Sequence, residues 1–92
     1  MKVQPPRVIG HNCEQMRFVC YAQIPQDRRR VVTGESLAGL GPREECGWAV
    51  FEGDGGYFLF TCDGSWHVMW DSWCEDLKSC KRIDVKWIDV AP

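Results

Sequence analysis

Three short apolar runs within residues 47–70 constrain the fold of this chain more than any other feature of its sequence. The runs are GWAVFE (47–52), YFLFTC (57–62) and WHVMW (66–70), and the turns between them are GDGG (53–56) and DGS (63–65). Turns rich in Asp and Gly between short aromatic and β-branched runs are a strong signal for β-hairpins. We therefore predict a three-strand antiparallel meander across residues 47–70.

Both faces of this meander carry large apolar side chains. Because side chains alternate along a strand, we expect the last strand to present Trp66, Val68 and Trp70 on one face and His67 and Met69 on the other. In the first two runs, apolar residues also occupy both odd- and even-numbered positions, and so would lie on both faces. A helix can cover one face, whereas the other face needs an N-terminal hairpin, a second subunit or a partner protein.

The N-terminal half predicts a β-hairpin that follows an irregular lead-in over residues 1–12. RFVCYAQI (17–24) alternates as a half-buried strand, so its even-numbered residues are expected to share one side. PQDR (25–28) has the residues of a turn, and RRVVTG (29–34) is expected to return as a second strand. Residues 35–46 are then a connection to the meander, because their glycines and proline prevent a long helix.

The charges of the chain favour a protein partner over a nucleic acid. Arg28, Arg29 and Arg30 would lie at the hairpin tip, but no aromatic residues are interleaved with them and the formal net charge is −2. We interpret this run as a solubilising loop. Residues 44–92 contain ten acidic and four basic residues, a balance of −6. An acidic half can steer a basic partner.

The segment DSWCED (71–76) predicts the start of a helix. Asp71 or Ser72 is expected as the N-cap. Ser72 and Glu75 have the spacing of a capping box, in which each side chain accepts a hydrogen bond from the backbone N–H of the other. Asp71 and Glu75 would also place negative charge at the positive end of the helix dipole.

Trp73, Leu77 and Cys80 recur at helical spacing after this start and would form one apolar stripe. We expect the helix to continue to about residues 86–88. RIDVKWIDV (82–90) also fits a final strand, because it alternates and is rich in β-branched residues. The sequence leaves these two alternatives open.

The predicted fold is therefore α+β, with an antiparallel sheet of four to five strands. The N-terminal hairpin and the three-strand meander form the sheet, and the C-terminal helix packs on one of its faces. Residues 1–92 are short enough for one domain. The chain has no run of about 20 apolar residues and no apolar signal-peptide core near its start, so we expect a cytoplasmic protein that does not bind a membrane.

Six cysteines are many for this length. In a reducing cytosol we expect them to remain thiols, whereas a mature secreted fragment would allow three disulfides, so their pairing stays open. His11 and Cys13 are the only closely spaced pair of metal ligands, and on one helix Cys74 and Cys80 would point in different directions. We therefore predict no metal and no cofactor.

The sequence also predicts no catalytic residue. Cys74 would lie in the first helical turn, where the helix dipole lowers a thiol pKa, but the adjacent Glu75 and Asp76 oppose a thiolate. His67 lies seven positions earlier, in the middle of a strand, and no oxyanion-hole element is recognisable.

The segment YFLFTCDGSWHVMWDSWCEDLKSCK (57–81) resembles the C-terminal half of a family of short bacterial proteins with little or no assigned activity. The family pattern reads roughly Y-L-F-x-C-D-x-x-W, then D-T-W-H-E-x-L-x-x-A-K, and then a helix that ends in E-Y-E-G. The matching residues are Tyr57, Leu59, Phe60, Cys62, Asp63, Trp66, Asp71, Trp73, Glu75, Leu77 and Lys81. Ser72 replaces a threonine, Cys74 a histidine and Cys80 an alanine, and the tail has no clear match to E-Y-E-G. The resemblance implies a fold and brings no mechanism with it.

These observations predict a small non-enzymatic protein-binding inhibitor, such as an immunity or anti-defence protein that neutralises a toxin or enzyme by direct binding. Interface anchors are usually aromatic, so the expected partner-binding residues are Asp54, Tyr57, Met69, Trp73 and Asp76. The alternative is a zinc- or thiol-dependent regulatory protein that uses His67 and several cysteines. A homodimer that buries the second sheet face is also open.

Overall fold

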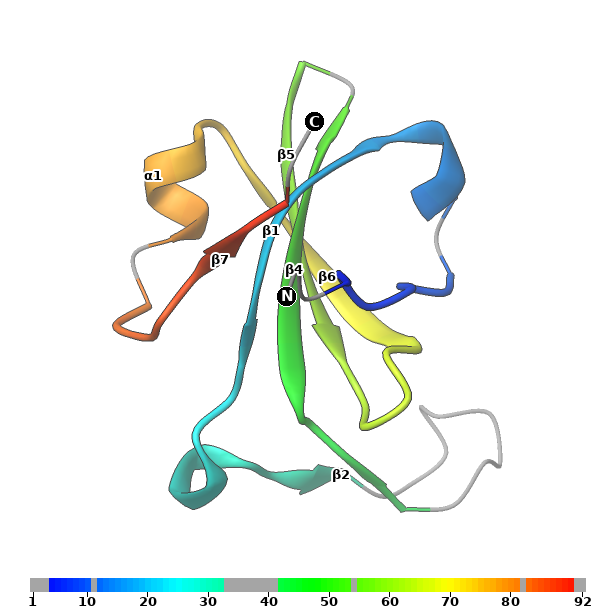
Figure 1. The fold of residues 1–92 in the computed structure, drawn as a ribbon, viewed down its shortest axis with the longest axis vertical. Helices are drawn as coiled ribbons and strands as arrows, with labels where there is room; N and C mark the ends of the chain where they lie inside the picture. Colours follow the sequence, from blue (N-terminus) through cyan, green and yellow to red (C-terminus); the bar gives the residue numbers. More distant parts are fainter. Residues whose placement is uncertain (1–3, 11, 33–41, 54, 82, 91–92) are drawn as a thin grey trace.

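A computed structural model describes residues 4–10, 12–32, 42–53, 55–81 and 83–90. Its main sheet has five antiparallel strands in the order β6-β5-β4-β1-β7 (Figure 1). These strands are β1 (Arg17–Gln23), β4 (Gly47–Gly53), β5 (Gly56–Cys62), β6 (Val68–Cys74) and β7 (Ile88–Asp89). Among the described residues, no helix is long and apolar enough to cross a membrane.

The predicted meander is confirmed as β4, β5 and β6. Its register places Phe51 opposite Phe58 and Phe60 opposite Asp71. Strand β6, however, continues four residues beyond its predicted end, so that Asp71 and Ser72 lie in the strand. The reason is that β5 offers a pairing partner along its whole length, and this pairing overrides the local capping preference.

The predicted capping box is therefore wrong. Glu75 lies in the bend after β6, and the helix α1 (Leu77–Cys80) has Asp76 as its N-cap. The Asp76 carboxylate accepts a hydrogen bond from the backbone N–H of Ser79 at 2.8 Å. The helical content of the fold is accordingly small, and the prediction of a long C-terminal helix is not confirmed.

The predicted N-terminal hairpin is also wrong. Strand β1 pairs with β4, while β2 (Val31–Val32) pairs with β3 (Arg43–Glu44) in a separate two-stranded sheet. The segment PQDR forms only one 3-10 turn, η2 (Gln26–Arg28), which displaces the chain without reversing it. The chain reverses between β2 and β3, and residues 33–41 lie outside the described residues. The connection expected over residues 35–46 is wrong at Arg43–Glu44, because these residues form β3.

One face of the sheet has an aromatic core, and we call it the N-terminal face. Its buried residues are Cys13, Ala49, Phe51, Phe60 and Cys62. Residues 4–10 and 12–16 cover this face, including the short η1 turn (Cys13–Gln15), and Val8 and Met16 pack onto its core. The expected irregular lead-in is therefore a structural cover, shown in dark blue in Figure 1.

The opposite face has a smaller core of Val19, Cys20, Val50 and Cys80, and we call it the C-terminal face. Helix α1 and the segment that ends in β7 cover it, with Leu77 and Trp87 packed inward. Strand β7 pairs with β1, so the strand alternative is correct for Ile88–Asp89. The final segment could not be a helix and also pair with this edge of the sheet.

A disulfide joins Cys74, at the end of β6, to Cys80 in α1, and their Cα atoms are 5.7 Å apart. The two cysteines lie on different elements and not on one helix, which is why their side chains can meet. Cys13, Cys20, Cys46 and Cys62 are free. The expectation of thiols thus holds for four cysteines and fails for this pair.

Two β-bulges change the predicted faces. Val19 of β1 has no pairing partner in β4, and Met69 of β6 has none in β5. As a consequence Trp70 pairs with Thr61 while Val68 pairs with Cys62, so Trp70 and Val68 lie on opposite faces. The expectation of one face shared by Trp66, Val68 and Trp70 is therefore wrong.

Candidate functional site

Strand β6 forms one edge of the five-stranded sheet. On its open side, Ile9 forms an isolated parallel bridge to His67, and no described residue pairs with β6 from Met69 to Cys74. Alternate backbone N–H and C=O groups along this stretch therefore point away from the sheet. Such an open edge is a template for a strand of another chain.

Trp73 is the main exposed aromatic side chain of this edge. It is 54% exposed although it pairs with Phe58 on the N-terminal face. Its indole lies over Gly56, where an added Cβ would come within 2.5–2.8 Å of the ring. The glycine lets the ring pack on the backbone of β5, so that one side of the indole is held and the other is open. An aromatic group held in this way is a suitable interface anchor.

A groove of about 330 Å³ lies between the η1 segment and strands β4, β5 and β6, and its lining includes Phe58, the cross-strand neighbour of Trp73. Phe58 and Phe60 form part of its lining, with nearly parallel rings whose centroids are 6.0 Å apart. Asn12 and Gln15 contribute amide groups from η1, and Asp71 contributes a carboxylate from β6. The Asp71 side chain is exposed, and its carboxylate makes no hydrogen bond or ion pair with any described residue. The groove thus combines an apolar floor with one unpaired negative charge.

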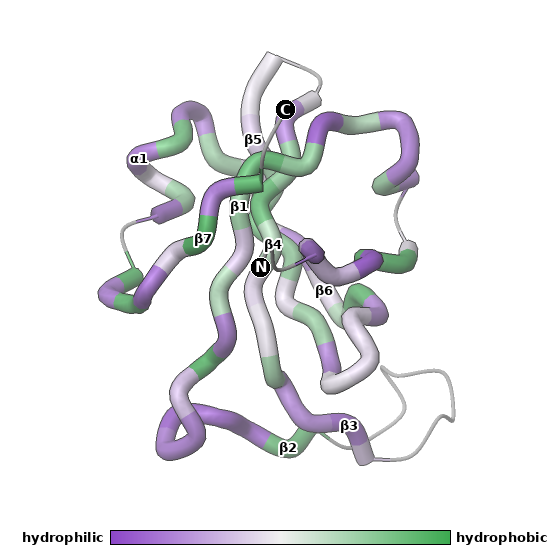
Figure 2. The backbone as a smooth tube through the Cα atoms, viewed as in Figure 1, coloured by the Kyte–Doolittle hydropathy of each residue, from purple (hydrophilic) through white to green (hydrophobic). Residues whose placement is uncertain are grey.

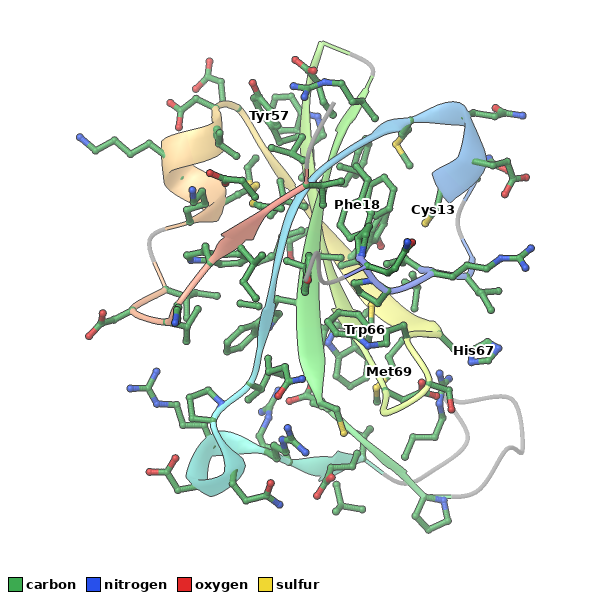
Figure 3. The ribbon with its side chains drawn as sticks, viewed as in Figure 1. Cys13, Phe18, Tyr57, Trp66, His67 and Met69 are labelled. Carbon is green, nitrogen blue, oxygen red and sulfur yellow. A yellow bond between two sulfur atoms is a disulfide. The ribbon has the colours of Figure 1, made fainter. Side chains whose placement is uncertain are left out.

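The structure does not gather the predicted partner-binding residues on one surface. Trp73 and Asp76 lie at the same end of β6, but the Asp76 carboxylate is already used as the α1 N-cap. Tyr57 packs on the C-terminal face, and Met69 lies at the bulge far from Tyr57 (Figure 3). Asp54 lies outside the described residues. These assignments stay predictions, and Trp73 has the geometry that suits them best.

Sequence reasoning missed Asp71 and Phe58 as neighbours of Trp73. The signal was hidden because Asp71 was interpreted as a helix cap. In the structure it is a strand residue opposite Phe60, on an otherwise apolar face. A carboxylate at such a position is also a known device against edge-to-edge aggregation.

A polar network holds the turn between β5 and β6. Arg43 donates two hydrogen bonds to one Asp63 carboxylate oxygen, at 2.7 and 3.1 Å. The other oxygen accepts from the backbone N–H groups of Ser65 and His67 at 2.9 and 3.0 Å. Burial alone would raise the pKa of Asp63, but these hydrogen bonds from Arg43, His67 and Ser65 outweigh it and hold the pKa below its usual value.

His67 is the only described histidine near this network, and its geometry does not support catalysis. Its imidazole Nδ1 lies 3.9 Å from Asp63 Oδ1, which is too long for a hydrogen bond, and the side chain is 51% exposed (Figure 3). The pocket beside it is lined by Ile9, Gly10, Arg43, Asp63 and Val68. None of these residues is a nucleophile of the kind that a histidine base activates.

The arginine run is engaged within the chain. Arg28 donates to the backbone carbonyl of Asp84 at 3.3 Å, and Arg29 donates to the carbonyl of Ile24 at 2.9 Å. Arg30 forms a two-bond pair with the buried carboxylate of Glu45 at 2.9 and 3.1 Å. The arm of η2, β2 and β3 is largely hydrophilic (Figure 2). These arginines therefore hold the arm in place.

The free thiols have the properties of packing groups. Burial raises the pKa of Cys13 and Cys20 to about 11 and that of Cys62 to about 12. Cys46 is half-buried, and burial followed by its hydrogen bond to Glu44 raises its pKa as well. Nucleophilic thiolates are therefore disfavoured. The described part of the chain contains no group of three or more His, Cys, Asp or Glu residues that could hold a metal ion, and His11 lies outside it.

No family model, curated protein or solved structure matches this chain. The family resemblance of residues 57–81 therefore stays a prediction. The β6 edge, the Trp73 indole and the adjacent groove are the surface features of the described residues that suit a binding role.

Proposed function

We propose that this chain is a small non-enzymatic inhibitor that binds a protein partner, as an immunity or anti-defence protein does when it neutralises a toxin or enzyme. The observation that carries the proposal is the open edge of β6 from Met69 to Cys74, with Trp73 held against Gly56 and 54% exposed beside it. The partner would add an extended segment to this edge through main-chain hydrogen bonds.

Charge decides which kind of segment fits best. Asp71, Glu75 and Asp76 are all exposed in and just after β6. A basic segment complements these carboxylates, whereas an acidic segment would be repelled. The aliphatic stem of a partner lysine or arginine would lie over Phe58, with its charged end against Asp71.

A second copy of this chain is the competing occupant of the edge. Pairing β6 with β6 of another copy would bring their Asp71 carboxylates onto adjacent strands, and like charges opposite each other on adjacent strands are destabilising. The same charges that favour a basic partner therefore disfavour the homodimer. Light scattering of the purified protein distinguishes a dimer from a monomer.

The test uses the full chain as bait in a lysate of its native host, followed by calorimetry with the partner that it captures. We expect Trp73→Ala to weaken binding by roughly tenfold or more, because it removes the anchor. Asp71→Lys reverses the charge of the groove and should weaken binding comparably. Val31→Ala and Asp84→Lys are matched controls, since both side chains are exposed away from the β6 edge.

Three outcomes would contradict the proposal. They are the absence of a stoichiometric partner, equal binding by the wild type and both β6 variants, and a stable homodimer that uses β6. Loss of binding in both control variants as well would place the interface elsewhere.

A thiol-dependent regulatory role is the second candidate, and the Cys74–Cys80 disulfide favours it. The bond joins the end of the binding edge to α1, so its reduction would loosen both. Partner affinity measured in oxidising and reducing buffers tests this role. Equal affinity in the two buffers would exclude regulation of binding through this bond.

A further inference from the structure

A second cavity, of about 500 Å³, is open to solvent on one side and shares no lining residue with the groove beside β6. The N-terminal segment, β1, the β5–β6 turn and the segment around β7 line it. Its lining is mainly apolar and includes Tyr21, Trp66 and Ile88. Pockets that hold small organic ligands typically measure about 300–1,000 Å³ and combine apolar walls with a few polar groups.

Tyr21 supplies the first observation that points to a ligand. Its side chain is only 6% exposed, yet its hydroxyl makes no hydrogen bond with any described residue. The hydroxyl is not fully enclosed by protein atoms, and Tyr21 is one of the residues that line the cavity. A largely buried tyrosine hydroxyl usually has a hydrogen-bond partner. A ligand in the cavity would provide that partner.

Trp66 supplies the second observation. Its backbone is left-handed, with φ at 62°, a conformation that is unfavourable for a bulky residue and recurs at binding sites. The Asp63 carbonyl accepts a hydrogen bond from its N–H at 3.0 Å and helps to hold this turn. The indole lies over Gly47, where an added Cβ would come 2.5 Å from the ring, and meets Tyr21 edge-on at 5.9 Å. One wall of the cavity is thus preformed.

The polar groups around the cavity select the charge of the ligand. Lys86 is the only charged side chain among the described lining residues, and Gln4 and Gln23 add neutral amides. A lysine ammonium donates and cannot accept hydrogen bonds, and the Tyr21 hydroxyl can donate as well. Both groups therefore favour an anion at one end of an apolar molecule.

We propose that this cavity binds a small apolar carboxylate. Its aromatic or branched aliphatic part would lie against Tyr21, Trp66 and Ile88, and its carboxylate would face Lys86 and the Tyr21 hydroxyl. This site is separate from the β6 edge. It would exist whether or not that edge binds a protein.

Titration of ¹⁵N-labelled protein by NMR tests the site with three probes of similar size and different charge. These are 3-phenylpropionate, its neutral amide and 3-phenylpropylamine. We expect 3-phenylpropionate to shift the backbone amides of Tyr21, Gln23 and Ile88 and to bind about tenfold more tightly than the amide, because it adds a charge-assisted hydrogen bond. The amine should bind more weakly than the amide.

Two variants and two matched controls sharpen the result. Lys86→Gln should abolish the preference for carboxylate over amide. Tyr21→Phe should lower the affinity for 3-phenylpropionate several-fold. Lys78→Gln and Tyr57→Phe change the same residue types outside the cavity and should leave the affinity unchanged. Lys86 is exposed, so its variant keeps the test valid if Tyr21→Phe unfolds.

The proposal is overturned by any of three results. No probe shifts the cavity residues, the carboxylate and the amide bind equally to the wild type, or Lys86→Gln keeps the full preference for the carboxylate.

Discussion

The two faces of the sheet are covered in different ways. On the N-terminal face, an irregular segment lies over a row of aromatic rings, in which Phe18 stacks on Phe51 at 4.6 Å and Phe51 contacts Phe60 at 5.5 Å. On the C-terminal face, a one-turn helix lies over Val19, Cys20 and Val50, and a disulfide ties it down. In this fold the larger apolar core holds a cover without regular structure, whereas the cover of the smaller core is supplemented by a covalent bond.

The largest expected effect comes from the aromatic core. Phe60 is 1% exposed and contacts both Phe51 and Phe58. Phe60→Ala should lower the free energy of unfolding by about 3–5 kcal/mol, because it removes the buried ring and leaves a cavity. Urea denaturation measures this change. Val50→Ala on the other face is the matched control and should cost about 2 kcal/mol. An equal or larger loss of unfolding free energy in Val50→Ala would contradict the larger contribution of the aromatic core.

The disulfide should give the next largest effect. Cys74→Ser removes the bond and should lower the free energy of unfolding by about 2 kcal/mol, because a short loop in the unfolded chain is no longer closed. Urea denaturation in oxidising and reducing buffers checks this, since reduction of the wild type should have the same effect. Cys46→Ser is the control, because Cys46 is free and only half-buried. Identical midpoints in both buffers would show that the bond does not stabilise this face.

The N-terminal cover depends on backbone hydrogen bonds to the β5–β6 turn. The Ile9 N–H donates to the Trp66 carbonyl at 3.0 Å, and Ile9 accepts from Val68 at 2.9 Å. Ile9→Pro removes the donor and should cost about 1 kcal/mol or slightly more. Hydrogen exchange should accelerate in residues 8–16 and stay unchanged in α1. Ile9→Ala keeps the N–H and serves as the control. Equal acceleration in α1 would mean that the two covers are not independent.

The smallest effect concerns pH and the turn that supports the N-terminal cover. The folded pKa of Asp63 is lowered, so its contribution to stability is complete above the ordinary aspartate value of 3.8. It is lost as the pH falls through the lower folded pKa. We expect this contribution to the free energy of unfolding to be about 1 kcal/mol. Acid unfolding of the wild type and of Asp63→Asn measures it as the difference between the two. Asp84→Asn is the control. The same acid dependence in Asp63→Asn and wild type would contradict the role of this network.

The meander was predictable because its information is local. The Asp- and Gly-rich turns lie next to the strands that they connect, and β4, β5 and β6 pair with their sequence neighbours. The pairing of β1 with β4 was not predictable in this way. It joins strands that are separated by the β2–β3 arm, and the PQDR segment resembles a hairpin turn although it forms a 3-10 turn.

The candidate sites were less predictable than the strands. The residue type of Trp73 predicts a place in the interface, but the packing of its indole over Gly56 depends on the register of β5 and β6. Asp71 was assigned to a helix cap because local capping chemistry is visible in a sequence and a continuing strand partner is not. Tyr21 gave no signal, because the cavity around it is formed by segments from both halves of the chain.

The sequence by itself determined that this chain forms an antiparallel meander with two apolar faces, because alternating side chains and turn residues act over a few positions. Only the tertiary structure decided what covers those faces. The bulge at Val19 depends on the pairing of β1 with β4, two strands that lie far apart in the sequence. The bulge at Met69, the extension of β6 through Asp71 and the Cys74–Cys80 bond depend on the register of β5 and β6 and on the position of α1. The stretch GSWHVMWDSWCED (64–76) is therefore one turn and one edge strand leading to the helix cap, with the half-exposed Trp73 packed over Gly56 of β5. Its local pattern fits a helix start equally well, and the neighbouring strand resolves the choice.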